Sequence, residues 1–241
     1  MTYSMPETAE EVAAGDSISR EDADAFAVPS HERAIAAIEG GRFKEEIVPV
    51  PVHGRKGQTT MVDTDEGPRP GTTLEVLAGL RPVVKPGGIV AAGNASSLND
   101  GASALVVASV AAVRRFGLAP RARVVAGGSA GVAPEVMGLG PVPATEKVLA
   151  KAGLPLDAIG AVELNEAFAT QSLAVMRRLG LDQGIDTNDG GAIALGHPLG
   201  SSGARIAITL LGRMEREGAR HGLATMCVGV GQGTSMIAEL A

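Results

Sequence analysis

The sequence is poor in aromatic residues and in cysteine, and both shortages restrict what the chain can be. Of its 241 residues, 2% are aromatic, none is tryptophan, and Cys227 is the only cysteine. A single cysteine allows no internal disulfide, which is typical of a reducing compartment, and we expect a cytoplasmic location. The four histidines are scattered without metal-ligand spacing, so we expect no metal site.

The sequence also lacks long runs of apolar residues and long runs of basic residues. No stretch of 18 apolar residues occurs, and we therefore expect no membrane span. The net charge is −6 and no long basic run is present, which disfavours binding to nucleic acid. The first 30 residues carry seven acidic side chains and one basic side chain, Arg20, and this balance is unlike that of a signal or transit peptide.

The chain is rich in apolar and small residues, and its two parts differ in sequence pattern. Apolar residues make up 45% of the sequence and 33 residues are glycine, which is typical of a globular protein with close backbone packing. Residues 1–93 are more polar and rich in turn formers. Capping patterns at Ser4 and Ser19 predict a helix to about residue 14 and a second helix ending at Gly40. Residues 47–52 resemble a strand, and we place a domain boundary near residue 94.

Residues 94–241 alternate strand-like and helical patterns. Expected strands cover residues 102–108, 124–126, 158–164, 224–230 and 234–240, and expected helices cover 143–152, 166–179 and 204–217. This order predicts a layered α/β domain of the form βαβαβαββ with a mostly parallel sheet. The short final connection predicts an antiparallel last pair, which makes the sheet mixed.

Three segments carry side chains that could do chemistry at strand ends. In residues 163–169 a strand ends at Asn165, which either caps the following helix or positions a water or carbonyl oxygen. Residues 190–203 are dense in glycine and hold His197 just before a helix, where a helix N-terminus disfavours the imidazolium. Residues 226–233 place Cys227 at a strand end, either as a small buried apolar group or as a reactive thiol.

Together these segments offer an amide, an imidazole, a thiol and the exposed N–H of Gly229 on loops of one sheet. Proton abstraction beside a carbonyl needs such a set, because a base must take the proton and donors must hold the enolate oxygen.

The order and spacing of these motifs resemble the thiolase family over essentially the whole chain. The motifs are Asn-Glu-Ala-Phe at 165–168, Gly-His-Pro at 196–198, Cys-Val-Gly at 227–229 and a coenzyme A loop around Ser96. The pattern is most similar to the 3-oxoadipyl-CoA branch. The resemblance implies a thiolase-like fold, in which residues 1–93 are part of a helical loop subdomain and residues 94–241 are the C-terminal domain.

The resemblance also implies roles for individual residues. His197 would activate a nucleophilic thiol, Cys227 would move a proton on and off the acyl α-carbon, and Asn165 and His197 would hold a thioester oxygen. The N–H of Gly229 would contribute to a second oxyanion hole. The implied contacts to coenzyme A and its acyl group come from Ser96, Arg69, Ala167 and Phe168.

The implied reaction is acyl transfer followed by Claisen condensation or its reverse, with acyl-CoA and CoA as substrates and no resident cofactor. The family's nucleophilic cysteine lies outside the part that this chain matches, and Cys227 does not replace it. We therefore expect a missing N-terminal half or a partner chain, and the family's dimer or tetramer for the full protein. Asp189 stands where the family usually has Asn, and a carboxylate there is expected to raise the pKa of His197.

The alternative from another class is a non-catalytic CoA-binding or assembly subunit, or an inactive fragment. The missing nucleophile favours it, whereas the intact set of Asn165, His197 and Cys227 speaks against it. A lipid-carrier relative is a weaker alternative, because the motifs are those of degradative or biosynthetic thiolases.

Overall fold

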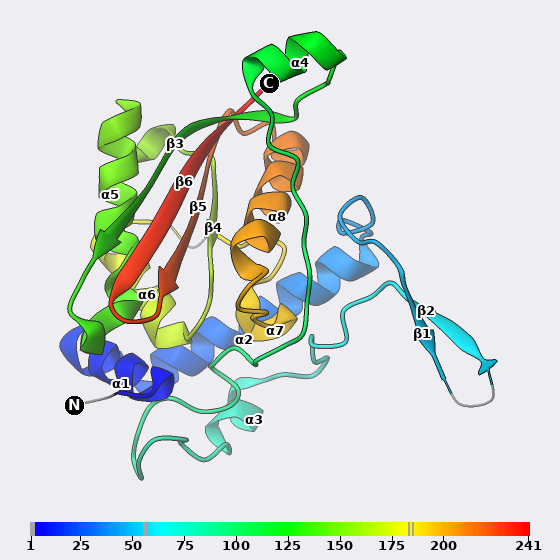
Figure 1. The fold of residues 1–241 in the computed structure, drawn as a ribbon. Coiled ribbons are helices and arrows are strands. Elements are labelled where there is room, and N and C mark those ends of the chain that lie inside the picture. Colours follow the sequence, from blue (N-terminus) through cyan, green and yellow to red (C-terminus); the bar gives the residue numbers. More distant parts are fainter. Residues whose placement is uncertain (1–2, 55–56, 183, 185) are drawn as a thin grey trace.

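A four-stranded mixed sheet forms the centre of the computed structural model, which describes residues 3–54, 57–182, 184 and 186–241 (Figure 1). Its strands are β3 (Ala122–Gly131), β4 (Ala161–Leu164), β5 (His221–Val228) and β6 (Gln232–Leu240). The strand order is β3-β6-β5-β4. β4 pairs with β5 in parallel, and β6 is antiparallel to both of its neighbours.

The expected mixed sheet and antiparallel final pair are confirmed, but the expectation of mostly parallel pairing is wrong. Strands β3, β4 and β5 run in one direction, as strands joined by helical crossovers do. The last strand, β6, inserts between β3 and β5 in the opposite direction. Only one of the three neighbouring pairs is therefore parallel.

Helices cover both faces of this sheet. Helices α5 (Pro141–Ala152) and α6 (Ala169–Leu179) lie on one face and α8 (Ser202–Glu217) lies on the other (Figure 1). Successive residues of a strand point to opposite faces. Leu223 and Ile237 accordingly join the core on the α5/α6 side, while Ala224 and Ala238 join the core under α8. The small residues on the α8 side allow that helix to approach the strands closely.

The N-terminal part contains the two expected helices. They are α1 (Met5–Gly15) and α2 (Arg20–Glu39), and each begins with the capping box that the sequence predicted, at Ser4 and Ser19. The expected strand over residues 47–52 is displaced to β1 (Val50–His53), which pairs antiparallel with β2 (Thr59–Val62). The short helices α3 (Leu74–Ala78), α4 (Val110–Phe116) and α7 (Ala192–Leu195), and the 3-10 turns η2 (Pro134–Leu139) and η3 (Leu156–Ala158), were not predicted.

The expected strand over residues 102–108 is not formed. Residues 101–109 have no regular secondary structure and run as an extended trace between the loop near α7 and helix α4 (Figure 1). Their apolar side chains face outward, with Val106 92% and Val107 85% exposed. The apolar run is typical of a buried strand, but a strand also needs a neighbour for its backbone hydrogen bonds, and no described strand pairs with it.

Candidate active site

Three loop segments, residues 94–99, 165–168 and 196–198, meet the end of β5 at residues 227–229. The N–H of Ser96 donates to the carbonyl of Ala167 at 3.0 Å, and the N–H of His197 donates to the carbonyl of Ser97 at 3.0 Å. Residues 94–99 therefore hold the Asn165 corner and the His197 loop together. Cys227 joins a buried cluster with Ala167 and Phe168, which adds the fourth segment.

Asn165 does not cap the following helix. Helix α6 begins at Ala169, and its N-cap is Phe168. The expected start at residue 166 is wrong because Ala167 lies in a bend and Phe168 is extended and bridges to Ala95. The side chain of Asn165 instead lies 3.5 Å from Nε2 of His197, and its buried Oδ1 has no hydrogen-bond partner among the described residues. An amide with a free buried acceptor or donor is suited to holding a water or a substrate group.

Hydrogen bonds to Ser202 set the tautomer of His197. Nδ1 of His197 lies 2.5 Å from Oγ of Ser202, and that hydroxyl in turn donates to the carbonyl of Pro198 at 3.1 Å. Because the hydroxyl has one proton and uses it on Pro198, Nδ1–H is the donor to Ser202. The neutral ring then keeps its lone pair on Nε2, which accepts a long hydrogen bond of 3.5 Å from Nδ2 of Asn165.

The backbone before His197 requires glycine. Gly196 has φ +94°, and a Cβ there would collide with the side chain of Asn99. This close approach lets Asn99 accept the N–H of His197 at 3.3 Å. Gly196 thus allows the Asn99 side chain to hold the backbone of His197 in place.

Burial lowers the pKa of His197, and the positive charge of Arg205 lowers it further. The predicted tendency towards a neutral base is confirmed in direction, although burial rather than the helix terminus is the main cause. The expected effect of Asp189 is wrong. Its buried carboxylate forms ion pairs with Arg42, at 2.7 Å, and with Arg216, so its charge is compensated away from the imidazole.

Cys227 is 4% exposed, and burial raises the pKa of its thiol to about 12. At neutral pH it is therefore a thiol, a form that can donate a proton. Its carbon-lined environment also fits the alternative of an inert apolar group.

Gly229 follows the end of β5, and no atom lies within 4 Å of the position where its Cβ would be. The space beside this glycine is open to a ligand.

The residues expected to contact coenzyme A divide into two groups. Ser96 donates through both its N–H and its hydroxyl to the carbonyl of Ala167, each at 3.0 Å, and Phe168 is adjacent. Arg69 lies apart from them, on an exposed stretch whose backbone N–H donates to Nδ1 of His31 at 3.1 Å. The structure therefore brings together Ser96, Ala167 and Phe168, and it places Arg69 beside α2.

Glu166 links three segments below the site and was not singled out from the sequence. Its carboxylate accepts the hydroxyl of Ser30 at 2.6 Å and the N–H of Ile193 at 3.2 Å. Burial raises its pKa. Gly191 lies directly against this carboxylate, because a Cβ there would overlap it. The Glu-Ala-Phe part of the motif thus ties α2 and the glycine-rich loop to Asn165.

Asp186 is a second buried acid near this corner, and its protonation should govern stability at neutral pH. Its Oδ1 accepts the N–H of Leu164 at 3.1 Å, and its Oδ2 has no partner among the described residues. Burial raises its pKa from 3.8 to about 7, with a further contribution from the carboxylate of Glu166. The folded state therefore favours the protonated acid. The stability that this preference contributes is present below about pH 4 and is lost as the pH rises through 7.

We expect the Asp186→Asn variant to depend less on pH than the unmodified chain. Asparagine is always neutral, so between pH 5 and pH 8 the variant should lose roughly 2 kcal/mol less free energy of unfolding. Urea unfolding at the two pH values measures this difference. The exposed Asp157, replaced by asparagine, serves as the control and should leave the pH dependence unchanged. Equal pH dependence in the chain and the Asp186→Asn variant would contradict the assignment.

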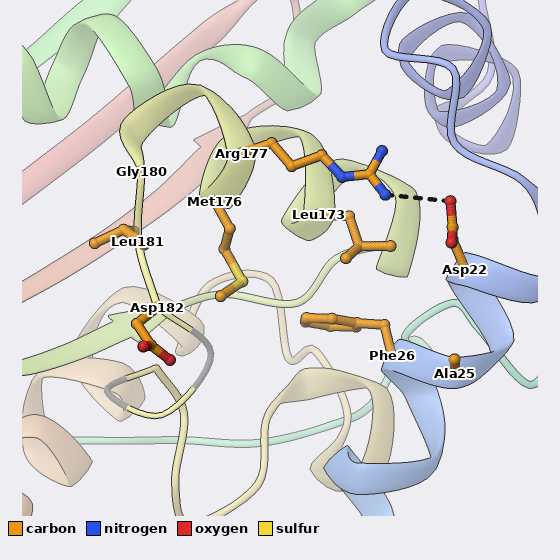
Figure 2. Close-up of a pocket in the computed structure, with 9 residues that line it drawn as sticks. All are labelled: Asp22, Ala25, Phe26, Leu173, Met176, Arg177, Gly180, Leu181 and Asp182. Atoms are coloured by element: carbon orange, nitrogen blue, oxygen red, sulfur yellow. Dashed lines mark hydrogen bonds and ion pairs between the residues drawn. The ribbon is translucent and has the colours of Figure 1, made fainter.

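A separate cavity of about 550 Å³ lies between α2 and α6. Figure 2 shows Phe26, Leu173 and Met176 on its walls and the ion pair between Asp22 and Arg177, 3.2 Å apart, at its side. None of the expected site residues lines it. The chemistry-bearing side chains therefore lie outside this cavity.

The described residues form neither a cluster of metal ligands nor a membrane-spanning helix. No group of three or more histidine, cysteine, aspartate or glutamate side chains there could hold a metal ion. No helix within the same residues has the length and apolar character needed to cross a membrane.

Comparison with known families gives two matches that together span nearly the whole sequence. The model of the thiolase C-terminal domain matches residues 118–240, and the model of the thiolase N-terminal domain matches residues 1–111. The chain belongs to the thiolase family. The expected boundary near residue 94 remains a prediction.

Similar thiolases are known from several bacteria. A beta-ketoadipyl-CoA thiolase of Pseudomonas aeruginosa is 58% identical over 98% of this chain and 59% of its own length. The 3-oxoadipyl-CoA/3-oxo-5,6-dehydrosuberyl-CoA thiolase of Escherichia coli is 53% identical over 99% of this chain and 60% of its own. The chain thus spans about three-fifths of the length of the curated thiolases it matches.

Solved thiolase structures superpose closely on this chain. The Bacillus anthracis acetyl-CoA acetyltransferase gives a TM-score of 0.96 at 43% identity, covering 98% of this chain and 60% of that structure. Human mitochondrial 3-ketoacyl-CoA thiolase in complex with CoA gives 0.94 at 46% identity, covering 98% and 59%. The thiolase-like α/β fold predicted from the sequence is therefore confirmed.

Proposed function

We propose that this thiolase chain supplies the base, the proton-transferring thiol and the oxyanion-binding groups of an acyl-CoA C-acyltransferase. The reaction is thiolytic cleavage of a 3-oxoacyl-CoA with CoA, or the reverse condensation with acetyl-CoA. The observation that carries the proposal is the meeting of Asn165 and His197, 3.5 Å apart, with Cys227 of β5 packed against the adjoining Ala167 and Phe168. The similarity to beta-ketoadipyl-CoA thiolases supports 3-oxoadipyl-CoA as the substrate.

In the cleavage direction, a nucleophilic thiol from outside this sequence attacks the 3-oxo carbon. Nε2 of His197 accepts the proton of that thiol, because it carries no proton of its own in this tautomer. The bond between C2 and C3 breaks, the acyl group stays on the nucleophile, and the thiol of Cys227 gives its proton to C2 of the departing acetyl-CoA. The thiolate of Cys227 then takes the proton of the incoming CoA thiol, CoA removes the acyl group, and Nε2 of His197 returns its proton to the released nucleophilic thiolate.

Donors near these residues are placed to hold the two oxygens that gain charge. Asn165, through a water, and the Nε2–H that His197 carries after accepting the proton would hold the thioester oxygen. The N–H of Gly229 would hold the second oxygen. Ser96, Ala167, Phe168 and Arg69 would contact the pantetheine, acyl and nucleotide parts of coenzyme A, and no resident cofactor takes part. A cytoplasmic dimer or tetramer, completed by the N-terminal half or a partner chain, is part of the same proposal.

The test is complementation. The chain is fused to the N-terminal two-fifths of the P. aeruginosa thiolase, and CoA-dependent cleavage of 3-oxoadipyl-CoA is measured. We expect turnover, with none from this chain alone. A folded fusion without turnover would refute the proposal. The alternative, a CoA-binding or assembly subunit, predicts CoA binding without turnover, and calorimetry that detects no CoA binding would exclude it.

A further inference from the structure

The turn after β5 contains a backbone conformation that valine rarely adopts. Val230 has φ +67°, in the left-handed region, and Gly231 follows it with φ +84°. Hairpin turns with two consecutive positive φ angles favour Asn-Gly, Asp-Gly or Gly-Gly, because a Cβ at the first of the two positions crowds the backbone. A β-branched side chain suits this conformation least, so Val230 is a strained residue.

The surrounding hairpin holds the turn in this shape. Val228 of β5 pairs with Gln232 of β6, which closes the turn. The carbonyl of Gly231 accepts the N–H of Val132 at 2.7 Å, and a Cβ on Gly231 would collide with the Val132 carbonyl oxygen. Residue 230 therefore takes its φ from the backbone around it, and asparagine or glycine would adopt that φ with less strain.

Packing within the chain does not offset the strain at Val230. Its side chain is 79% exposed, and it belongs to none of the apolar clusters that the described residues form. Thr187 is the other β-branched residue with a positive φ in the described part of the chain, but it is buried and its N–H donates to the carbonyl of Val162 at 3.1 Å. A strained, exposed valine beside a candidate active site is expected to serve a ligand rather than the fold.

The position of the turn relates Val230 to one part of the substrate. A 3-oxoacyl-CoA has two carbonyl groups, and the proposed mechanism places the thioester oxygen at Asn165 and His197. The oxygen that remains for the N–H of Gly229 is the one on C3, the carbon that also carries the acyl chain. The Cα atoms of Gly229 and Val230 are about 3.8 Å apart, as across any trans peptide, and the space beside Gly229 is open. A ligand whose C3 oxygen reaches this N–H therefore brings the first carbons of its acyl chain close to residue 230.

We propose that Val230 is a specificity-determining residue whose isopropyl group contacts the first methylene groups of the acyl chain. The contact removes apolar surface of both partners from water, which favours a substrate with methylene groups at C4 and C5, such as 3-oxoadipyl-CoA. Acetoacetyl-CoA has only a methyl group on C3 and gains little from the same contact. The inference rests on the proposed function, because that function assigns the C3 oxygen to Gly229.

The experiment compares these two substrates in the fusion with the N-terminal part of the P. aeruginosa thiolase. We expect Val230→Asn to lower kcat/KM for 3-oxoadipyl-CoA about tenfold relative to kcat/KM for acetoacetyl-CoA, because an apolar contact with a methylene group is worth about that factor. Val230→Ile keeps an apolar β-branched side chain and should preserve the ratio. Val124→Asn, at another exposed valine in β3, is the control and should also preserve it. An unchanged ratio in Val230→Asn would overturn the proposal.

Urea unfolding of this chain tests the strain separately. Asparagine tolerates the left-handed region, so Val230→Asn should raise the urea midpoint. The same substitution at Val124 should lower the midpoint, because asparagine suits a strand less well than valine does. A lower midpoint in Val230→Asn would show that this valine serves the fold, and would overturn the proposal.

Ligand binding distinguishes this inference from the proposed function. Succinyl-CoA is the cleavage product of 3-oxoadipyl-CoA in which the former C3 is the thioester carbon, and acetyl-CoA carries a methyl group at the same place. Calorimetry on the fusion should show that Val230→Asn weakens binding of succinyl-CoA about tenfold relative to acetyl-CoA. A fusion that binds both ligands without turnover would refute the proposed function, and the ratio of affinities would still decide the role of Val230. Failure to bind either ligand would refute both.

Discussion

Replacing His197 with asparagine is expected to lower kcat/KM of the completed enzyme by about a thousandfold or more. Asparagine can still reach the hydroxyl of Ser202, so the loop should keep its conformation, but it cannot accept a proton as imidazole does. Removal of a general base typically costs 10²–10⁴ in rate, and about the same range is expected here. The measurement is CoA-dependent cleavage of 3-oxoadipyl-CoA by the fusion, with unfolding curves to show that the variant folds.

Ser202→Ala is the matched control for this prediction. It removes the partner of Nδ1, at 2.5 Å, and leaves the imidazole itself in place. The loss of activity should therefore be smaller than in His197→Asn, and the pH profile should shift because the tautomer is no longer fixed. If both variants kept nearly full activity, His197 would not be the base.

The second large effect is expected in stability, from Gly233→Ala. Gly233 lies in β6 between Cys227 of β5 and Ala130 of β3, and the backbone of Gly140 crosses directly over it. A Cβ at this position would overlap the Gly140 carbonyl carbon and oxygen, which cannot swing aside as a flexible side chain can. The start of α5 would have to move away from the sheet. We expect a loss of more than about 3 kcal/mol in the free energy of unfolding.

Gly229→Ala, four residues earlier in the same hairpin, is the stability control. Nothing lies within 4 Å of its Cβ position, so the added methyl group should change the free energy of unfolding by less than about 1 kcal/mol. Urea unfolding of both variants gives the comparison. Similar losses in the two variants would show that the close approach of Gly140 to Gly233 does not constrain the fold.

The features that the sequence predicted correctly depend on neighbouring residues. The capping boxes at Ser4 and Ser19 start their helices through side chains three residues apart. The hairpin of β5 and β6 is closed by a short turn. The motifs around Asn165 and Cys227 lie at the ends of the neighbouring strands β4 and β5, whereas the His197 motif lies in the loop between α7 and α8.

The features that it missed depend on residues far apart in the chain. Helix α6 begins at Ala169 and not at residue 166 because Phe168 bridges to Ala95 and because the carboxylate of Glu166 is bound by Ser30. Neither partner can be identified from the local pattern. The same holds for the insertion of β6 between β3 and β5. A serine five residues after a candidate histidine, at the start of a helix, was the one available signal for Ser202.

The uncovered apolar run at residues 101–109 also determines how this polypeptide should behave in concentrated solution. The run has no charged residue and no proline, and its backbone is already extended, with Val106 92% and Val107 85% exposed. Segments of this kind add readily to the edge of another molecule's sheet or stack into fibrils. Self-association of the isolated chain should therefore rise with concentration even well below its unfolding temperature. A binding partner that pairs with these residues would protect the chain better than any substitution in its core.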